Sequence, residues 1–145
     1  MGFELNVSSR MENLGPISDF ITSAASQFGL DEDQAFAVQM AVDEACANVI
    51  EHAYAGRVDG SIQIRAELVN DQVVVTIHDH GQPFDPTCVL PPNLCAPIEE
   101  QEDRCLGLFL MGKLMDTVDF RFDAVQGNLL TMTKSRHSGI PSVGA

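Results

Sequence analysis

Positive charge is scarce in this sequence. Only eight of the 145 residues are Lys or Arg, against 21 Asp or Glu, so the formal net charge is −13 at pH 7. No Lys or Arg occurs between Arg10 and Arg57. Such a field repels nucleic-acid backbones and anionic lipid, which argues against nucleic acid or membrane binding as the main task. One phosphorylated small molecule is still compatible, because a metal ion cancels phosphate charge and a helix N-terminus binds phosphate without Lys.

Cysteine patterns and long apolar runs are also missing. The four cysteines form no Cys-x-x-Cys pair and have no His at zinc-finger spacing: Cys46, Cys88, Cys95 and Cys105. We interpret Cys46 as a core residue and favour incidental thiols over a disulfide or metal site for the other three. No apolar run reaches the roughly 18 residues of a membrane span, and the N-terminus lacks the features of a signal peptide. The expected compartment is the reducing cytoplasm.

What is present is an ordinary globular composition, with 45% apolar and 20% charged residues. Its length suggests one domain, 1–135, followed by a frayed tail, 136–145. Period-2 alternation predicts strands over 3–7, 61–68, 73–79, 119–122 and 129–133, and period-3.6 patterns predict helices over 11–29, 31–54 and 106–115. This order predicts an α+β fold of two layers, with a mixed or antiparallel sheet and helices on one face. Regular signals vanish over about 80–105, which we interpret as a lid or binding loop.

Three polar residues share one face of the second helix. Glu44, Asn48 and His52 are four residues apart, about 40° around the axis of an α-helix, so they form one stripe. The stripe alone is equally compatible with a solvated helix face. We interpret His52 as an edge or packing residue in preference to a phosphate ligand.

A second polar cluster follows the third strand. Asp79 and Gly81 lie where that strand gives way to the loop, a common position for ligand-binding side chains. Asp79-His-Gly81 alone is a common structural turn, but together with the helical stripe it favours a binding site.

These segments resemble a known superfamily. Glu44-x-x-x-Asn48, Asp79-x-Gly81 and Leu106-Gly107-Leu108 match, in order and spacing, the boxes of the GHKL ATPases. Within that superfamily the sequence is most similar to the small anti-sigma-factor serine/threonine kinases. The resemblance covers residues 3–134 and implies a Bergerat-type α/β sandwich that binds ATP and Mg²⁺.

The resemblance also implies a role for each matched residue. Asn48 would bind Mg²⁺ through its amide oxygen, and Glu44 would orient or deprotonate the attacking hydroxyl. Asp79 would accept a hydrogen bond from the adenine amino group, and Gly81 would let the backbone approach the base. Gly107 would lead into a helix that binds phosphate. Leu108 belongs to the same box, although its spacing alone indicates a core residue.

The sequence departs from the family pattern around the last box. Arg104-Cys105 replaces glycines that precede Gly107 in the family, and Arg104 is either a γ-phosphate clamp or a surface residue beside its acidic neighbours. Phe84 is either a loop anchor or a stacking partner of the base. The family commonly brings a Thr of the closing strand to the adenine, and here Leu129 is expected at that position.

The leading hypothesis is a kinase of partner-switching type. It would phosphorylate a STAS-type anti-anti-sigma protein, sequester a sigma factor or other target, and form a homodimer, as the resemblance implies. The alternative is a non-catalytic binding module gated by nucleotide, which the altered glycines favour and Glu44 disfavours. A histidine-kinase fragment is the third hypothesis, and it lacks a helical phospho-acceptor His segment.

Overall fold

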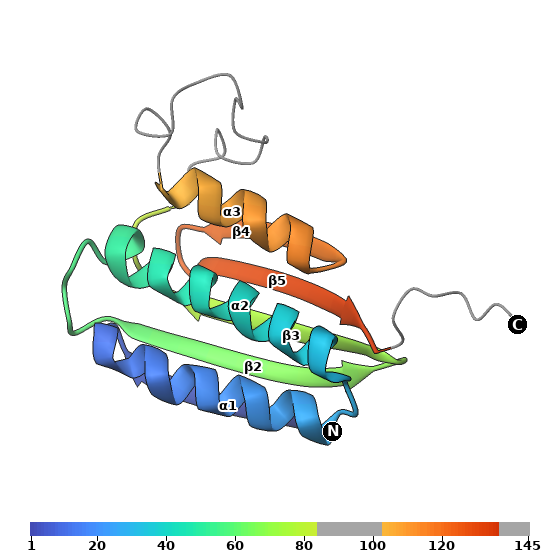
Figure 1. Ribbon diagram of the computed structural model, residues 1–145. Coiled ribbons are helices and arrows are strands. Elements are labelled where there is room, and N and C mark those ends of the chain that lie inside the picture. The colour runs from blue at the N-terminus through green and yellow to red at the C-terminus, as the bar shows by residue number, and fades with distance from the viewer. Residues whose placement is uncertain (84–102, 137–145) are drawn as a thin grey trace, which may run out of the picture.

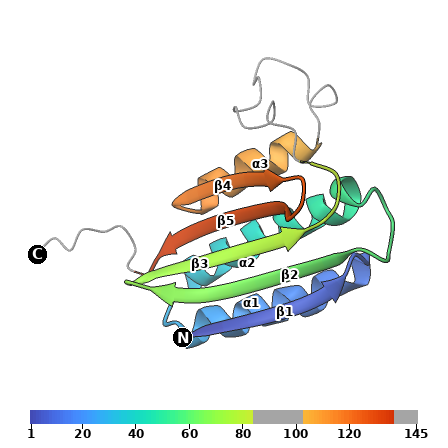
Figure 2. The same ribbon diagram turned by 180° about the vertical axis from the view of Figure 1, so that it is seen from behind.

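The chain forms two layers, a five-stranded sheet with three helices packed against one face (Figure 1). The computed structural model describes residues 1–83 and 103–136, except for the side chains of 103–108. The elements are β1 (Gly2–Ser8), α1 (Leu14–Gln27), α2 (Glu32–Asn48), β2 (Ser61–Val69), β3 (Gln72–Asp79), α3 (Asp103–Leu114), β4 (Thr117–Asp123) and β5 (Gly127–Ser135). In the described residues no helix covers the opposite face of the sheet (Figure 2). The predicted α+β class is therefore confirmed.

The strands lie in the order β1-β2-β3-β5-β4, and every neighbouring pair is antiparallel. Of the two predicted possibilities, the sheet is therefore antiparallel and not mixed. The hairpin between β2 and β3 turns at Asn70 and Asp71, which both have positive φ (50° and 65°). Two residues of this conformation match the right-handed twist of the flanking strands. This turn holds β3, which carries Asp79 at its end, in register with β2.

The core lies between the sheet and the helices. Alternate residues of β3 (Val73, Val75 and Ile77) are buried, as the period-2 pattern predicts. They pack against apolar residues of α1 and α2 that recur every three to four positions and so lie on one face of each helix. The largest fully buried members are Phe28, Ile17, Ile21, Ile62, Ile64, Ile77, Met111, Met132, Val38, Val42, Val73 and Val75. Cys46 is also fully buried, as expected, and burial raises the pKa of its thiol.

The second helix begins as predicted and ends differently. The Asp31 carboxylate accepts from the Gln34 backbone N–H (2.7 Å) and the Gln34 side chain accepts from the Asp31 N–H (3.1 Å), a capping box. The sequence predicted an α-helix to about Tyr54. Instead, α2 ends at Asn48 and continues as a π-helical turn, Val49–Ala53, in which the Tyr54 N–H reaches back five residues to the Val49 carbonyl (2.9 Å). Single π turns of this kind are frequent at functional sites.

Several boundaries differ from the sequence prediction; the first helix, predicted over 11–29, is a 3-10 turn (Met11–Asn13) followed by α1, and β4 and β5 are each longer than predicted. The α3 helix begins at Asp103, three residues before the predicted start at Leu106. Arg136 belongs to the predicted frayed tail, but its backbone N–H donates to the Asp71 backbone carbonyl (2.8 Å). The Arg136 guanidinium also forms an ion pair with the Asp71 carboxylate. The rest of the predicted tail and most of the predicted lid lie outside the described residues. No helix of the described part is long and apolar enough to cross a bilayer.

Candidate functional site

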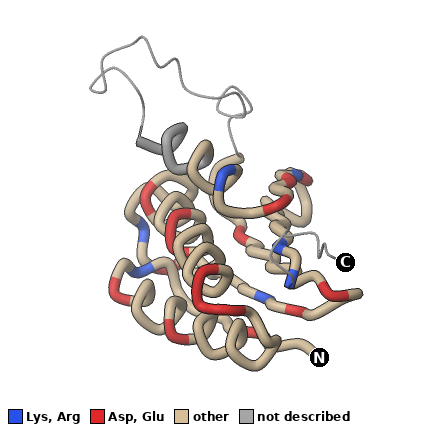
Figure 3. The backbone as a smooth tube through the Cα atoms, turned by 45° about the vertical axis from the view of Figure 1, so that its right-hand side comes forward, with Lys and Arg blue, Asp and Glu red and all other residues tan. Residues whose placement is uncertain are grey.

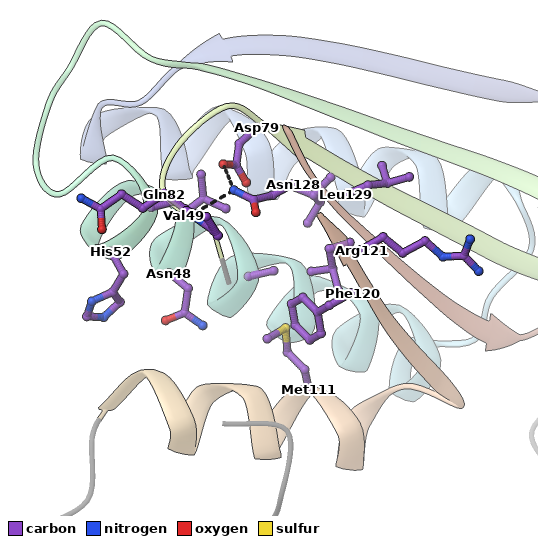
Figure 4. A pocket seen from close by; sticks show the side chains of 15 residues that line it. Asn48, Val49, His52, Asp79, Gln82, Met111, Phe120, Arg121, Asn128 and Leu129 are labelled. Atoms are coloured by element: carbon purple, nitrogen blue, oxygen red, sulfur yellow. Dashed lines mark hydrogen bonds between the residues drawn. The ribbon is translucent and has the colours of Figure 1, made fainter. Parts of the chain in front are cut away.

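A pocket opens between the end of α2, the helix α3 and the adjoining ends of β3 and β5 (Figure 4). About 540 Å³ of space not filled by protein atoms lies within it, a volume that includes open solvent. Its lining is mostly apolar with a few polar groups: Ala45, Asn48, Val49, His52, Ala53, Ile77, Asp79, Gln82, Pro83, Met111, Phe120, Arg121, Asn128, Leu129 and Leu130.

The pocket brings together three residues that the sequence singled out. Asn48, His52 and Asp79 all line it, although they come from two separate segments. Glu44 lies one helical turn before Asn48, is partly exposed, and is not among the lining residues. Gly81 is not among them either, but its neighbour Gln82 is. The helical stripe and the turn after β3 therefore belong to one site.

The remaining predicted site residues are described only in part. Phe84 lies outside the described residues, so neither of its proposed roles is tested. Arg104, Gly107 and Leu108 lie within α3, where the backbone alone is described. Because α3 starts at Asp103, the free N–H groups of its first turn belong to 103–106. Gly107 therefore does not lead into the helix, as we had expected, but follows its first turn.

Asp79 is the most buried charged group at the pocket, with 4% of its surface exposed. Its Oδ1 accepts from the Gly81 backbone N–H (2.8 Å) and from the Asn128 side-chain Nδ2 (2.8 Å). Burial raises the pKa of Asp79, and these two hydrogen bonds oppose the shift by stabilising the charged form. One carboxylate oxygen is thus committed to the protein, and the other is the candidate acceptor for a ligand.

Gly81 is required by packing against the helix. A Cβ at this position would lie 2.5 Å from the Ala53 carbonyl carbon and oxygen, closer than real contacts allow. The next residue, Gln82, donates its backbone N–H to the Ala53 carbonyl (2.7 Å). We had expected Gly81 to permit approach of a ligand base, but the observed contact is with the π turn of the helix. The turn after β3 is therefore joined directly to the end of the helical segment that carries Asn48.

Tyr54 makes a second connection between the same two segments. Its hydroxyl donates to the Ser61 carbonyl (2.6 Å) and accepts from the His80 backbone N–H (2.8 Å), and the residue is 3% exposed. Tyr54, which follows the π turn, thus holds the backbone of His80, which follows Asp79. Together the two connections fix the position of Asp79 relative to Asn48.

Asn128 is the main site residue that the sequence analysis missed. It lies opposite Asp79 in the β3–β5 register, with 9% of its surface exposed. Leu129, which we expected on the adenine side, also lines the pocket and pairs with His78, the residue before Asp79. Consecutive strand residues point to opposite faces, so Asn128 and not Leu129 meets the Asp79 side chain. The signal that could have found it is a polar residue, Asn128, directly after the turn glycine Gly127, at the start of a strand that is otherwise apolar on its buried face.

Asn48 is the candidate metal ligand. Its Nδ2 is buried without a hydrogen-bond partner in the described part of the chain, and the residue as a whole is partly exposed at the pocket. An amide oxygen suits a hard cation such as Mg²⁺, which keeps most of its waters and takes few protein ligands. Among the described residues no three His, Cys, Asp or Glu side chains converge. The residues present therefore fit a weakly held cation completed by ligand phosphates better than a protein cage.

The first two helices carry only negative charge, whereas the pocket is lined by one Asp and one Arg. Acidic positions follow the α1 and α2 segments, where the sequence has no Lys or Arg (Figure 3). Arg121 is the one Lys or Arg that lines the described pocket, and its side chain points away from the interior and pairs with Asp119 (2.9 Å, Figure 4). Among the described side chains that line the pocket, no Lys or Arg is therefore directed at its interior.

Comparison with known proteins places the chain in one family. The family model of the histidine kinase-like ATPase domain matches residues 7–134. The chain is 32% identical over 135 residues to the serine-protein kinase RsbW of Halalkalibacterium halodurans, covering 90% of this chain and 81% of the relative. It is 31% identical to the enzyme of the same name from Bacillus subtilis, covering 90% and 83%.

Solved structures share the architecture at low sequence identity. The RsbU and RsbW domains of Rv1364c from Mycobacterium tuberculosis match with a TM-score of 0.68 and 19% identity, over 93% of this chain and 32% of that one. This chain thus spans about a third of that protein. The histidine kinase domain from Erythrobacter litoralis EL346 matches with a TM-score of 0.56 and 17% identity, over 86% of this chain and 59% of that one. The chain belongs to the histidine kinase-like ATPase family, and within it to the group of the RsbW serine-protein kinases.

Proposed function

We propose that the protein is an ATP-dependent serine/threonine protein kinase of anti-sigma type. It phosphorylates a STAS-type antagonist, sequesters a partner such as a sigma factor, and acts as a cytoplasmic homodimer with Mg²⁺. The observation that carries this proposal is the single pocket that both the buried Asp79 and Asn48 line. The similarity to RsbW serine-protein kinases along 90% of the chain supports the choice of reaction.

The proposal assigns a task to each end of the pocket. Asp79 accepts a hydrogen bond from the adenine amino group through the oxygen not used by Gly81 and Asn128. Asn48 would hold Mg²⁺ through its amide oxygen, and the bound ion would neutralise phosphate charge. Glu44, one turn earlier, orients or deprotonates the hydroxyl of the protein substrate. Most of the catalysis then comes from positioning the two reactants.

The test is a phosphorylation assay with purified components. The wild-type protein is incubated with ATP, Mg²⁺ and a panel of STAS domains, and phosphoserine or phosphothreonine is detected by mass spectrometry. We expect transfer to at least one domain, and loss of the Mg²⁺ dependence of ATP binding in Asn48→Ala. An ATP affinity that is the same with Mg²⁺ and with EDTA in the wild type would remove Asn48 from the metal site.

A nucleotide-gated binding module without catalysis is the second candidate. Arg104-Cys105 in place of the family's glycines favours it. This candidate predicts that ATP and ADP change the affinity for a partner while no phosphate is transferred. Partner binding measured with each nucleotide, beside the phosphorylation assay, separates the two candidates.

A further inference from the structure

Asn128 has a nitrogen that is fully engaged. Its Nδ2 donates to Asp79 Oδ1 (2.8 Å), to the Gln82 carbonyl (2.9 Å) and, more weakly, to the Gly81 carbonyl (3.3 Å). An amide nitrogen carries two N–H bonds, so these three acceptors leave it no hydrogen for a ligand. The donor side of Asn128 therefore faces the protein.

The oxygen of the same amide is unused. Asn128 is more than nine-tenths buried, yet its Oδ1 has no hydrogen-bond partner in the described part of the chain. Buried polar atoms are nearly always paired, so an orphan acceptor on a residue that lines the pocket points to a donor supplied by a ligand. In Figure 4 this oxygen is directed away from Asp79, on the side of the pocket's other side chains.

The amide cannot exchange its two ends. A 180° flip would place Oδ1 against the Asp79 carboxylate and the carbonyls of Gly81 and Gln82, all of which are acceptors. Three hydrogen bonds would be lost and replaced by repulsion between acceptors. The orientation of Asn128 is thus locked, and the pocket presents an acceptor at this point and no donor.

We propose that Asn128 is a specificity-determining residue, whose side-chain oxygen accepts a hydrogen bond from the exocyclic amino group of the purine and excludes 6-oxo purines. This inference rests on the proposed binding of an adenine nucleotide. The adenine amino group has two N–H bonds, one for the free oxygen of Asp79 and one for Asn128. Guanine and hypoxanthine place a carbonyl oxygen there, opposite two acceptors.

A hydroxyl at this position would not impose the same selection. The hydroxyl of Thr or Ser rotates and serves as donor or acceptor, so it tolerates either an amino or a carbonyl group. Asn128→Thr therefore keeps a polar side chain beside Asp79 while removing the fixed acceptor. Thr131→Val, on the same strand but on the face away from the helices, is the matched control.

The experiment measures affinities for ATP, N6-methyl-ATP and inosine triphosphate by calorimetry. N6-methyl-ATP retains one of the two N–H bonds, so the wild type should bind it about 2- to 12-fold more weakly than ATP, the range for one neutral hydrogen bond. Asn128→Thr should reduce that difference and bring the ATP and inosine triphosphate affinities closer together. Thr131→Val should keep both ratios of the wild type.

The possible outcomes separate this inference from the proposed function. Equal affinity of the wild type for ATP and N6-methyl-ATP overturns the role of Asn128, even if its variants fail to fold. ATP binding with ratios that Asn128→Thr leaves unchanged also overturns it, while the proposed function stands. A wild type that binds no adenine nucleotide overturns both.

Discussion

At the proposed base end of the pocket, Asp79 and Asn128 are each at least 91% buried and share a hydrogen bond, and Gly81 packs on the helix. At the proposed phosphate end, Asn48 and His52 are partly exposed, as is Glu44 one helical turn before Asn48, and the Asn48 Nδ2 lacks a partner in the described residues. The base end is thus completed by the fold itself, whereas the phosphate end is left for ligands to complete. Substitutions should therefore affect nucleotide binding and stability at the first end, and turnover at the second.

The largest effect should come from the phosphate end and spare binding. Glu44→Ala should keep ATP affinity and lower the rate of phosphotransfer by roughly 10²- to 10⁴-fold, as expected for a general base. The measurement is the single-turnover rate with a STAS-domain substrate. Glu51→Ala, an exposed carboxylate two turns later, is the control and should keep the wild-type rate. An equal rate for both variants would remove Glu44 from the mechanism.

At the base end, Asp79→Asn should weaken binding instead. The charged acceptor for the adenine amino group is lost, which costs about 1.5–3 kcal/mol of ATP binding free energy. Calorimetry compares the variant with Asp19→Asn, an exposed position of α1 that should bind ATP like the wild type. If Asp79→Asn binds ATP as tightly as the wild type, the base end has been assigned to the wrong residues.

A substitution that disturbs only packing should reveal the rigid connection at the base end. Gly81→Ala places a Cβ 2.5 Å from the Ala53 backbone, so we expect about 1–3 kcal/mol of lost unfolding free energy from overpacking. Gly112→Ala in α3 meets nothing within 4 Å and should stabilise the helix by about 0.5–1 kcal/mol. Urea unfolding of both variants checks the contrast. A Gly81→Ala protein of wild-type stability would mean that the turn after β3 moves freely relative to the helix.

The smallest effect is the pH dependence of stability. Burial raises the pKa of Asp79, so between the ordinary Asp pKa and this raised value the folded protein holds a proton that the unfolded chain has released. The free energy of unfolding therefore falls as pH rises through that window and levels off above it. Asp79→Asn has no carboxyl group to titrate at this position. The difference in unfolding free energy between the wild type and Asp79→Asn should therefore change with pH only within that window. A difference that is constant from pH 3 to pH 7 would contradict the raised pKa.

The sequence predicted those features of the fold that depend on local pattern. The capping box at Asp31, the tight turn at Asn70-Asp71 and the buried alternation of β3 each follow from a few neighbouring residues. The boxes of the ATPase superfamily also predicted that Asn48 and Asp79 would share a pocket, although they are about thirty residues apart in the chain. These predictions succeeded because local propensity and tertiary packing favour the same structure.

Features that depend on tertiary contacts were not predictable. The π turn after Asn48 occurs where the chain meets Gly81 and Gln82, and nothing in the local helical pattern marks it. The contact between Asn128 and Asp79 depends on the register of β5 against β3, two strands that are far apart in the chain. Neither segment alone shows which of its residues faces the other strand, so the local pattern did not indicate Asn128.

The hydrogen bond from the Gln82 N–H to the Ala53 carbonyl joins backbone to backbone and does not depend on the identity of either side chain. In a saturation library, position 82 should therefore accept most residues and reject proline, which has no N–H to donate. Position 81 should accept almost none, because any Cβ meets the Ala53 backbone. Positions 81 and 82 would thus differ sharply in how many substitutions they tolerate. A growth-based screen that depends on partner binding can measure this difference.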